Sequence, residues 1–206
     1  MARNFFNPEG LVWKPLGALG DLVMLSLLWG ICSIPLVTIG PATAALYDCT
    51  AHCVRRGEDG LFSRFKRTFL AELKTGLLST LLWAAVLGAL YVLRALLMRR
   101  LGYAGTGGVV GMATLVVLLV PTGMACWVFP LLSRFTFDFR NLNLTAVRMV
   151  FAFLPSTLIL VLLTIEVLQW GLNEIYPFFF MPAVTMLLWS LFIEKAFAKY
   201  EVNSEK

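Results

Sequence analysis

The sequence has little charge and a single histidine. Charged side chains make up 14% of the 206 residues, and His52 is the one histidine in the chain. There is no glycine-rich phosphate loop, no G-x-S-x-G nucleophile elbow and no H-E-x-x-H metal motif. One histidine leaves little for acid-base chemistry at neutral pH. We therefore predict that the protein is not an enzyme and has no catalytic residues, no metal site and no cofactor.

The chain also lacks a polar domain of its own. Its formal charge is +5, but the basic residues lie at the ends of apolar runs, which indicates membrane topology and argues against nucleic-acid binding. Four cysteines lie in apolar or small-residue surroundings with no extracellular domain to cross-link: Cys32, Cys49, Cys53 and Cys126. We expect them to be reduced and unpaired.

Apolar residues dominate what is present. Hydrophobic side chains make up 59% of the sequence, and the mean hydropathy is +0.82. The apolar runs approach or exceed the roughly 17 to 25 residues that span a bilayer as a helix, and they lie near residues 16–39, 76–98, 109–132, 149–168 and 178–193. Because the runs do not alternate as barrel strands do, we predict one all-α integral membrane domain over residues 1–206.

The first apolar run is interrupted by a predicted turn. Pro35 disfavours helix at the preceding residue, Gly40 can adopt a positive φ, and Pro41 suits the first turn of a new helix. A short second helix over 41–56 should follow, rich in small residues that allow close packing. Hydropathy alone counts five spans, whereas this turn predicts six.

The positions of lysine and arginine favour six spans with both termini in the cytoplasm. That arrangement leaves only three of the 17 basic residues, Arg94, Arg99 and Arg100, on the outer side, whereas five spans would also export Arg3 and Lys14. The predicted helices form three hairpins, and they lie near residues 16–36, 41–56, 70–98, 106–130, 144–169 and 176–197.

Asp48 and His52 form a candidate polar site within the second predicted helix. They are four residues apart on one face, beside Cys49 and Cys53. These are metal-ligand residue types, but one helical turn supplies only part of a tetrahedral zinc site. Two interpretations remain: a polar face buried against neighbouring helices, or a relay for protons or solute at membrane depth.

The cytoplasmic segment 57–72 is predicted to be an amphipathic surface helix. Its phenylalanines repeat at i, i+3 and i+7, and its basic residues lie on other faces. The helix is expected either to be anchored to anionic lipid headgroups or to dock a partner protein. Its residues are Phe62, Arg64, Phe65, Lys66, Arg67 and Phe69.

The segments 61–65 and 131–135 match in part, as Leu-Phe-Ser-Arg-Phe and Leu-Leu-Ser-Arg-Phe. Both lie in predicted connections between hairpins, which is what a parallel repeat would produce. The alternative is a chance match, because a chain built from few residue types repeats short segments by chance.

An ordered series of short blocks resembles a known family. The blocks are residues 4–8, 20–21, 32–40, 44–47 and 56–58. Together they resemble the YesL-like family of small bacterial membrane proteins, a domain of unknown function. The presence of Asp48, Cys49, His52 and Cys53 departs from the apolar residues that the resemblance leads us to expect.

The resemblance implies an integral protein of the bacterial cytoplasmic membrane, commonly encoded beside carbohydrate ABC transporters. We therefore expect an accessory or regulatory membrane subunit that associates with the permease or ATPase subunits of a sugar ABC importer. A stand-alone transporter of a small solute or ion is the alternative.

The six-span topology predicts that a cysteine placed at residue 2 is protected from membrane-impermeant thiol reagents in intact cells. Labelling as strong as that of an outer-loop control would instead support five spans.

Overall fold

A computed structural model describes residues 13–102, 106–135, 138–173 and 180–204. Every regular element in these ranges is helical, which confirms the all-α prediction. In chain order the elements are α1 (Trp13–Cys32), η1 (Leu36–Thr38), α2 (Ile39–Cys49), η2 (Thr50–Val54), α3 (Leu61–Ala71), α4 (Leu73–Leu101), α5 (Thr106–Arg134), α6 (Phe139–Ala152), α7 (Leu154–Asn173) and α8 (Met181–Ser204). Residues 4–8, which belong to the family resemblance, lie outside the described ranges.

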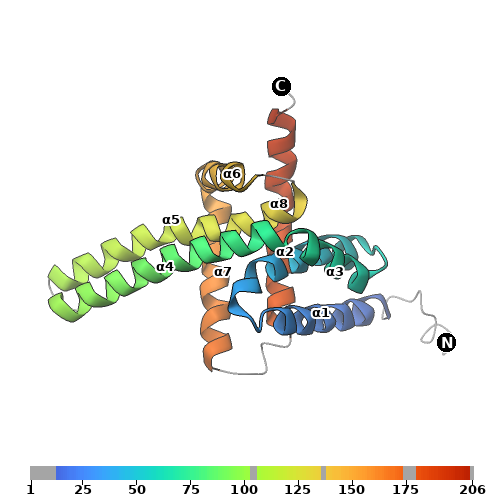
Figure 1. The fold of residues 1–206 in the computed structure, drawn as a ribbon, viewed down its shortest axis with the longest axis horizontal. Coiled ribbons are helices and arrows are strands. Elements are labelled where there is room, and N and C mark those ends of the chain that lie inside the picture. The colour runs from blue at the N-terminus through green and yellow to red at the C-terminus, as the bar shows by residue number, and fades with distance from the viewer. Residues whose placement is uncertain (1–12, 103–105, 136–137, 174–179, 205–206) are drawn as a thin grey trace, which may run out of the picture.

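The short helix α2 lies at the centre of the fold. It packs against α1, α3, α4, α5 and α8, and every residue from Gly40 to Cys49 is buried. Around it, α4 and α5 form a long hairpin that extends to one side, and α7 and α8 run at a steep angle to that hairpin (Figure 1). The core therefore lies at the inner end of the hairpin, and most of the outer hairpin surface is apolar and exposed.

Two helices, α4 and α5, are long and apolar enough to cross a membrane, and α6 with α7 makes a third if the bent pair counts as one span. The apolar part of α1, Gly17–Cys32, is shorter. These lengths agree with a membrane protein, whereas the number of spans and their orientation stay predictions.

The single helix predicted over residues 144–169 is wrong. The chain bends by 104° between α6 and α7, with Phe153 in a non-helical conformation at the end of α6. Pro155 lies in the first turn of α7, and it favours the break because it lacks an N–H donor and its ring would clash with the last turn of a continuous helix. Pro121 and Pro130, by contrast, lie inside α5 without ending it.

The prolines predict a turn at residues 37–41, and the structure has the break between α1 and α2 slightly earlier, at residues 33–38, with α2 beginning at Ile39. Pro35 is extended (φ −74°, ψ 108°) at the start of η1, and the Thr38 hydroxyl donates to the Cys32 and Pro35 carbonyls, each at 2.6 Å. Gly40 and Pro41 lie in the first turn of α2. Among the described residues, positive φ occurs only at Gly57, Gly60 and Gly102, so Gly40 is not there for backbone freedom.

Close approach of α2 to α4 explains Gly40. A Cβ at Gly40 would collide with Thr80 Oγ1 and lie 2.6 Å from the Phe129 ring and 2.8 Å from the Gly76 carbonyl oxygen. The contact is reciprocal, because a Cβ at Gly76 would lie 2.9 Å from Pro41 Cδ. The Gly40 N–H donates to Thr80 Oγ1 at 3.1 Å. Two glycines thus let the helices approach within backbone contact.

We expect Gly40→Ala to lower the stability by about 1–3 kcal/mol, because the added methyl group overpacks this contact. A fall in the thermal unfolding temperature of the detergent-purified protein measures the effect. Gly88→Ala is the matched control, since a Cβ at Gly88 on α4 meets nothing within 4 Å. Equal unfolding temperatures for the two variants would contradict the packing explanation.

Candidate functional site

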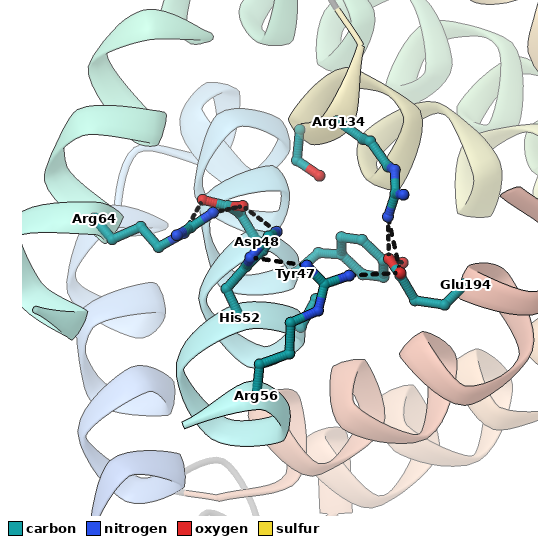
Figure 2. A pocket seen from close by; sticks show the side chains of 9 residues that line it. Tyr47, Asp48, His52, Arg56, Arg64, Arg134 and Glu194 are labelled. Carbon is teal, nitrogen blue, oxygen red and sulfur yellow. Dashed lines mark hydrogen bonds and ion pairs between the residues drawn. The ribbon is translucent and has the colours of Figure 1, made fainter. Parts of the chain in front are cut away.

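A cavity of about 300 Å³ lies where the end of α2 meets α3, α5 and α8. Its walls carry three arginines, two carboxylates, one histidine and one phenol, all shown in Figure 2. The lining residues are Tyr47, Asp48, Ala51, His52, Arg56, Arg64, Ser133, Arg134 and Glu194.

The local backbone brings the α2 side chains to this cavity. Residues Thr50–Val54 form a π-helical turn, an irregularity that changes the direction of side chains and often occurs at functional sites. The helix then ends at Gly57, whose positive φ (72°) suits the position after a helix C-terminus. Gly60, with φ 88°, precedes α3. Two left-handed glycines thus turn the chain so that α3 packs back on α2.

The Asp48 carboxylate is the centre of one ion-pair group. Its side chain is 9% exposed, and Arg64 donates to both of its oxygens, from Nε at 2.8 Å and from Nη2 at 3.1 Å. Thr68 Oγ1 donates to Asp48 Oδ2 at 2.8 Å. Such a two-pronged arginine contact is among the strongest polar contacts in proteins. The pair therefore fixes α3 to α2.

Glu58 and His52 extend this group toward solvent. Arg64 Nη1 donates to Glu58 Oε2 at 2.7 Å. His52 Nδ1 lies 3.0 Å from Glu58 Oε1, and His52 Nε2 lies 3.6 Å from Asp48 Oδ1. Hydrogen bonding with His52 lowers the pKa of Glu58, while the hydrogen bond to Asp48 raises the pKa of Arg64. Both shifts favour the charged forms of Glu58 and Arg64.

The Glu194 carboxylate of α8 is the centre of a second group. Arg134 Nη1 donates to both of its oxygens at 2.8 Å, Arg56 Nη2 donates at 3.2 Å and the Tyr47 hydroxyl at 3.3 Å. The Arg134 guanidinium also lies 5.5 Å from the centre of the Phe197 ring. Glu194 therefore connects α8 to α2 through Tyr47, to the segment after η2 through Arg56, and to α5 through Arg134.

The two groups meet across the cavity. Arg56 Nη1 lies 3.4 Å from His52 Nδ1, so a continuous chain of contacts runs from Arg64 through Asp48, His52 and Arg56 to Glu194 and Arg134 (Figure 2). Both lining carboxylates are satisfied by arginine. The ion pairs that line the cavity hold α2, α3, α5 and α8 together, and the cavity itself has room for a small polar molecule.

Among the residues that the structure describes, no group of three or more His, Cys, Asp or Glu side chains is arranged so that it could hold a metal ion. Cys49 and Cys53 are buried, and all four cysteines are free, as predicted. The Cys49 thiol donates to the Leu61 carbonyl at 3.7 Å. Asp48 is buried and His52 is half-buried, and the choice between a buried polar face and a relay stays a prediction.

The structure divides the predicted docking residues of α3 between two faces. Phe65 is 3% exposed and stacks on the half-buried Phe69, with ring centres 6.3 Å apart, so the core takes both. Arg64 turns inward to Asp48. Phe62, Lys66 and Arg67 remain exposed. Of the six residues predicted to anchor to lipid or dock a partner, three are therefore exposed and three are buried or half-buried, and the docking role of this segment stays a prediction.

Sequence reasoning missed Tyr47, Arg56, Arg134 and Glu194 as site residues. The matching segments 61–65 and 131–135 held the signal, because their arginines, Arg64 and Arg134, each pair with a cavity carboxylate. Their final phenylalanines, Phe65 and Phe135, both pack on the core. The match between the two segments therefore pointed to Arg134 as a cavity residue equivalent to Arg64.

The described residues form an all-helical fold with helices long and apolar enough to span a membrane and with an ion-paired polar cavity. The family described as "Protein of unknown function, DUF624" matches residues 22–93, from α1 through most of α4. The match includes Asp48, Arg64 and the Gly40 contact, and it ends before Arg134 and Glu194. No curated protein and no solved structure shows significant similarity to the chain. The match agrees with the resemblance as far as a family of unknown function, and the YesL-like assignment stays a prediction.

We expect Asp48→Asn to destabilise the protein by about 2 kcal/mol, since it leaves the Arg64 guanidinium without its buried counter-charge. Thermal unfolding in detergent measures the loss. Glu58→Gln is the matched control, because it removes the exposed carboxylate of the same arginine and should change stability little. The double variant Asp48→Asn, Arg64→Gln should lose less than the two single losses combined, and strict additivity would argue against a coupled pair.

Proposed function

We propose that this protein is an accessory or regulatory subunit that works by docking to another membrane protein, with a carbohydrate ABC importer of the bacterial cytoplasmic membrane as the partner. The partner class comes from the YesL-like resemblance. In this proposal the protein has six spans and both termini are cytoplasmic, so that α3 faces the permease loops or the ATPase. It performs no chemistry of its own.

The observation that carries the proposal is the outer face of α3. Phe62 and Leu70 are 59% and 54% exposed, and Lys66 lies between them at i+4, so the three form one stripe along the helix. We call Phe62, Lys66 and Leu70 the α3 stripe, and Arg67 is exposed beside it. Aromatic and aliphatic side chains beside positive charge suit a protein interface with acidic groups at its rim.

Rigidity of α3 supports docking further. The helix is held from its other side by the Arg64 to Asp48 pair, by Thr68 and by the buried Phe65 ring. A surface that is already fixed loses little conformational entropy on binding. Lipid headgroups are the competing occupant of the same stripe, since basic residues near a membrane attract anionic lipids.

A stand-alone carrier is the second candidate, and the charged cavity favours it. Asp48 and His52 line a space of about 300 Å³, which has room for a small polar solute. Against this role, the lining carboxylates are paired with arginines, and a carrier must release such groups during its cycle. A structural role, in which the ion pairs hold the helices together, is therefore the better explanation of these charges.

The test is affinity purification from native membranes in mild detergent, followed by identification of stoichiometric partners. Phe62→Ala should lower recovery of the importer subunits about tenfold, as expected for an aromatic anchor worth about 1–2 kcal/mol. Phe151→Ala is the matched control, because Phe151 on α6 is equally exposed, at 58%, and lies off the stripe. Lys66→Gln with Arg67→Gln should weaken binding to anionic vesicles strongly, and it should lower partner recovery less than Phe62→Ala does, because charges at the rim of an interface contribute less than a buried aromatic anchor.

Two outcomes would contradict the proposal. One is recovery of the protein only with itself, under conditions that keep known importers assembled. The other is specific sugar or ion flux in liposomes that contain this chain alone, lost in Asp48→Asn and retained in Glu58→Gln, which would favour the carrier.

A further inference from the structure

The accessible part of the charged cavity is positive. Its wall carries three arginines against two carboxylates. The carboxylates are the least accessible of these charges, because the side chains of Asp48 and Glu194 are 9% and 13% exposed, whereas that of Arg56 is 46% exposed. A molecule that enters the cavity therefore meets guanidinium groups before it meets a carboxylate.

The hydrogen-bond acceptors of the wall are largely used already. Both oxygens of Asp48 accept from Arg64, and both oxygens of Glu194 accept from Arg134. The Tyr47 hydroxyl donates its proton to Glu194 as well. A ligand that donates hydrogen bonds would have to break these contacts, so the cavity favours a ligand that accepts them.

Arg56 supplies the donors for such a ligand. His52 Nδ1 lies 3.0 Å from Glu58 Oε1 and 3.4 Å from Arg56 Nη1. An ionised carboxylate only accepts, so the shorter contact places a proton on Nδ1, and a nitrogen that donates to Glu58 cannot also accept from Arg56.

The Arg56 guanidinium is therefore only partly satisfied. Among the described residues it makes one hydrogen bond, from Nη2 to Glu194 at 3.2 Å, whereas a guanidinium has five N–H donors. Figure 2 shows Arg56 between His52 and Glu194, at the junction of the two ion-pair groups. Its unused donors lie in the wall of the cavity.

We propose that the charged cavity binds a small soluble oxyanion, of the carboxylate or phosphate class, through Arg56. The planar guanidinium fork matches the spacing of the oxygens in both groups. The volume of about 300 Å³ lies at the small end of the roughly 300–1,000 Å³ that is usual for ligand sites. Because Glu194 already occupies one side of Arg56, the ligand competes with that carboxylate.

The wall favours a soluble anion over a lipid headgroup. Apart from Ala51 and the Tyr47 ring, its lining residues are polar or charged, so an acyl chain finds no apolar surface there. The inference concerns binding alone and does not depend on the proposed docking role.

Isothermal titration calorimetry of the full-length protein in detergent tests the proposal, with sodium sulfate, phosphate and acetate as the probes and sodium chloride added to hold the ionic strength constant. We expect a dissociation constant of about 1 mM or below for at least one of these anions. Arg56→Gln should weaken that binding about tenfold, because it removes the charged donor. Arg148→Gln is the matched control: it removes an exposed arginine of α6 outside the cavity and should change the affinity less than twofold.

Glu194→Gln should change the affinity in the opposite direction. It removes the competing carboxylate and one negative charge from the wall, so the anion should bind about threefold more tightly, while the protein loses stability. A purely structural role for these charges predicts the loss of stability without the gain in affinity. If Glu194→Gln fails to fold by gel filtration, Arg56→Lys takes its place, and it should bind more weakly than the unaltered protein but more tightly than Arg56→Gln.

Four results would overturn the proposal. The first two are no measurable binding of any of the three anions, and equal losses in Arg56→Gln and Arg148→Gln, which would indicate unspecific attraction to a basic protein. The third is binding of neutral glycerol as tight as that of the anions, which would indicate a site for hydroxyl groups. The fourth is displacement of bound sulfate by phosphatidylglycerol in the micelle, which would identify a lipid headgroup as the ligand.

Discussion

The rest of the structure depends on one constraint: the Asp48 carboxylate is buried and must be neutralised. An isolated ionised carboxylate in a low-dielectric interior costs far more than the few kcal/mol by which a domain is stable. Arg64 meets this requirement with two hydrogen bonds, and Thr68 adds a third. Because both partners lie on α3, the helix can pack in only one rotation about its axis. That rotation sends Phe65 into the core and leaves Phe62 outside.

The same logic acts a second time at Glu194. Arg134, Arg56 and Tyr47 satisfy that carboxylate from three other elements, so α8 is joined to the α2 end of the fold through charge as well as through apolar packing. The two groups together explain why a chain with so few charged residues places several of them around one cavity. In an apolar setting each ion pair is directional, and it selects one arrangement of helices where apolar contacts alone would allow several.

Close packing of small residues complements these ion pairs. Gly40 and Pro41 approach Gly76 and Thr80 at backbone distance, which brings α2 against α4 and lets α2 be buried on all sides. The helix is too short to rely on its own length for a stable place in a bilayer, and burial by its neighbours removes that requirement. Small residues thus hold the start of α2, at Gly40 and Pro41, and paired charges hold its end, at Asp48.

The sequence by itself determined the helical class, the apolar runs, the break at Pro35 to Pro41 and the amphipathic character of residues 61–71, because each follows from local rules of periodicity, propensity and proline sterics. The sequence could also have located the break before Pro155, because proline disfavours the interior of a helix. The long apolar run on both sides of Pro155 led instead to the prediction of one continuous helix over residues 144–169. Only the tertiary structure decided that Arg64 and Arg134 point inward, that Tyr47 and Glu194 share a cavity, and that Gly40 serves close packing and not a turn. These outcomes depend on contacts between residues 16 to 147 positions apart, and no pattern within a single helix encodes which distant charge a buried carboxylate will meet.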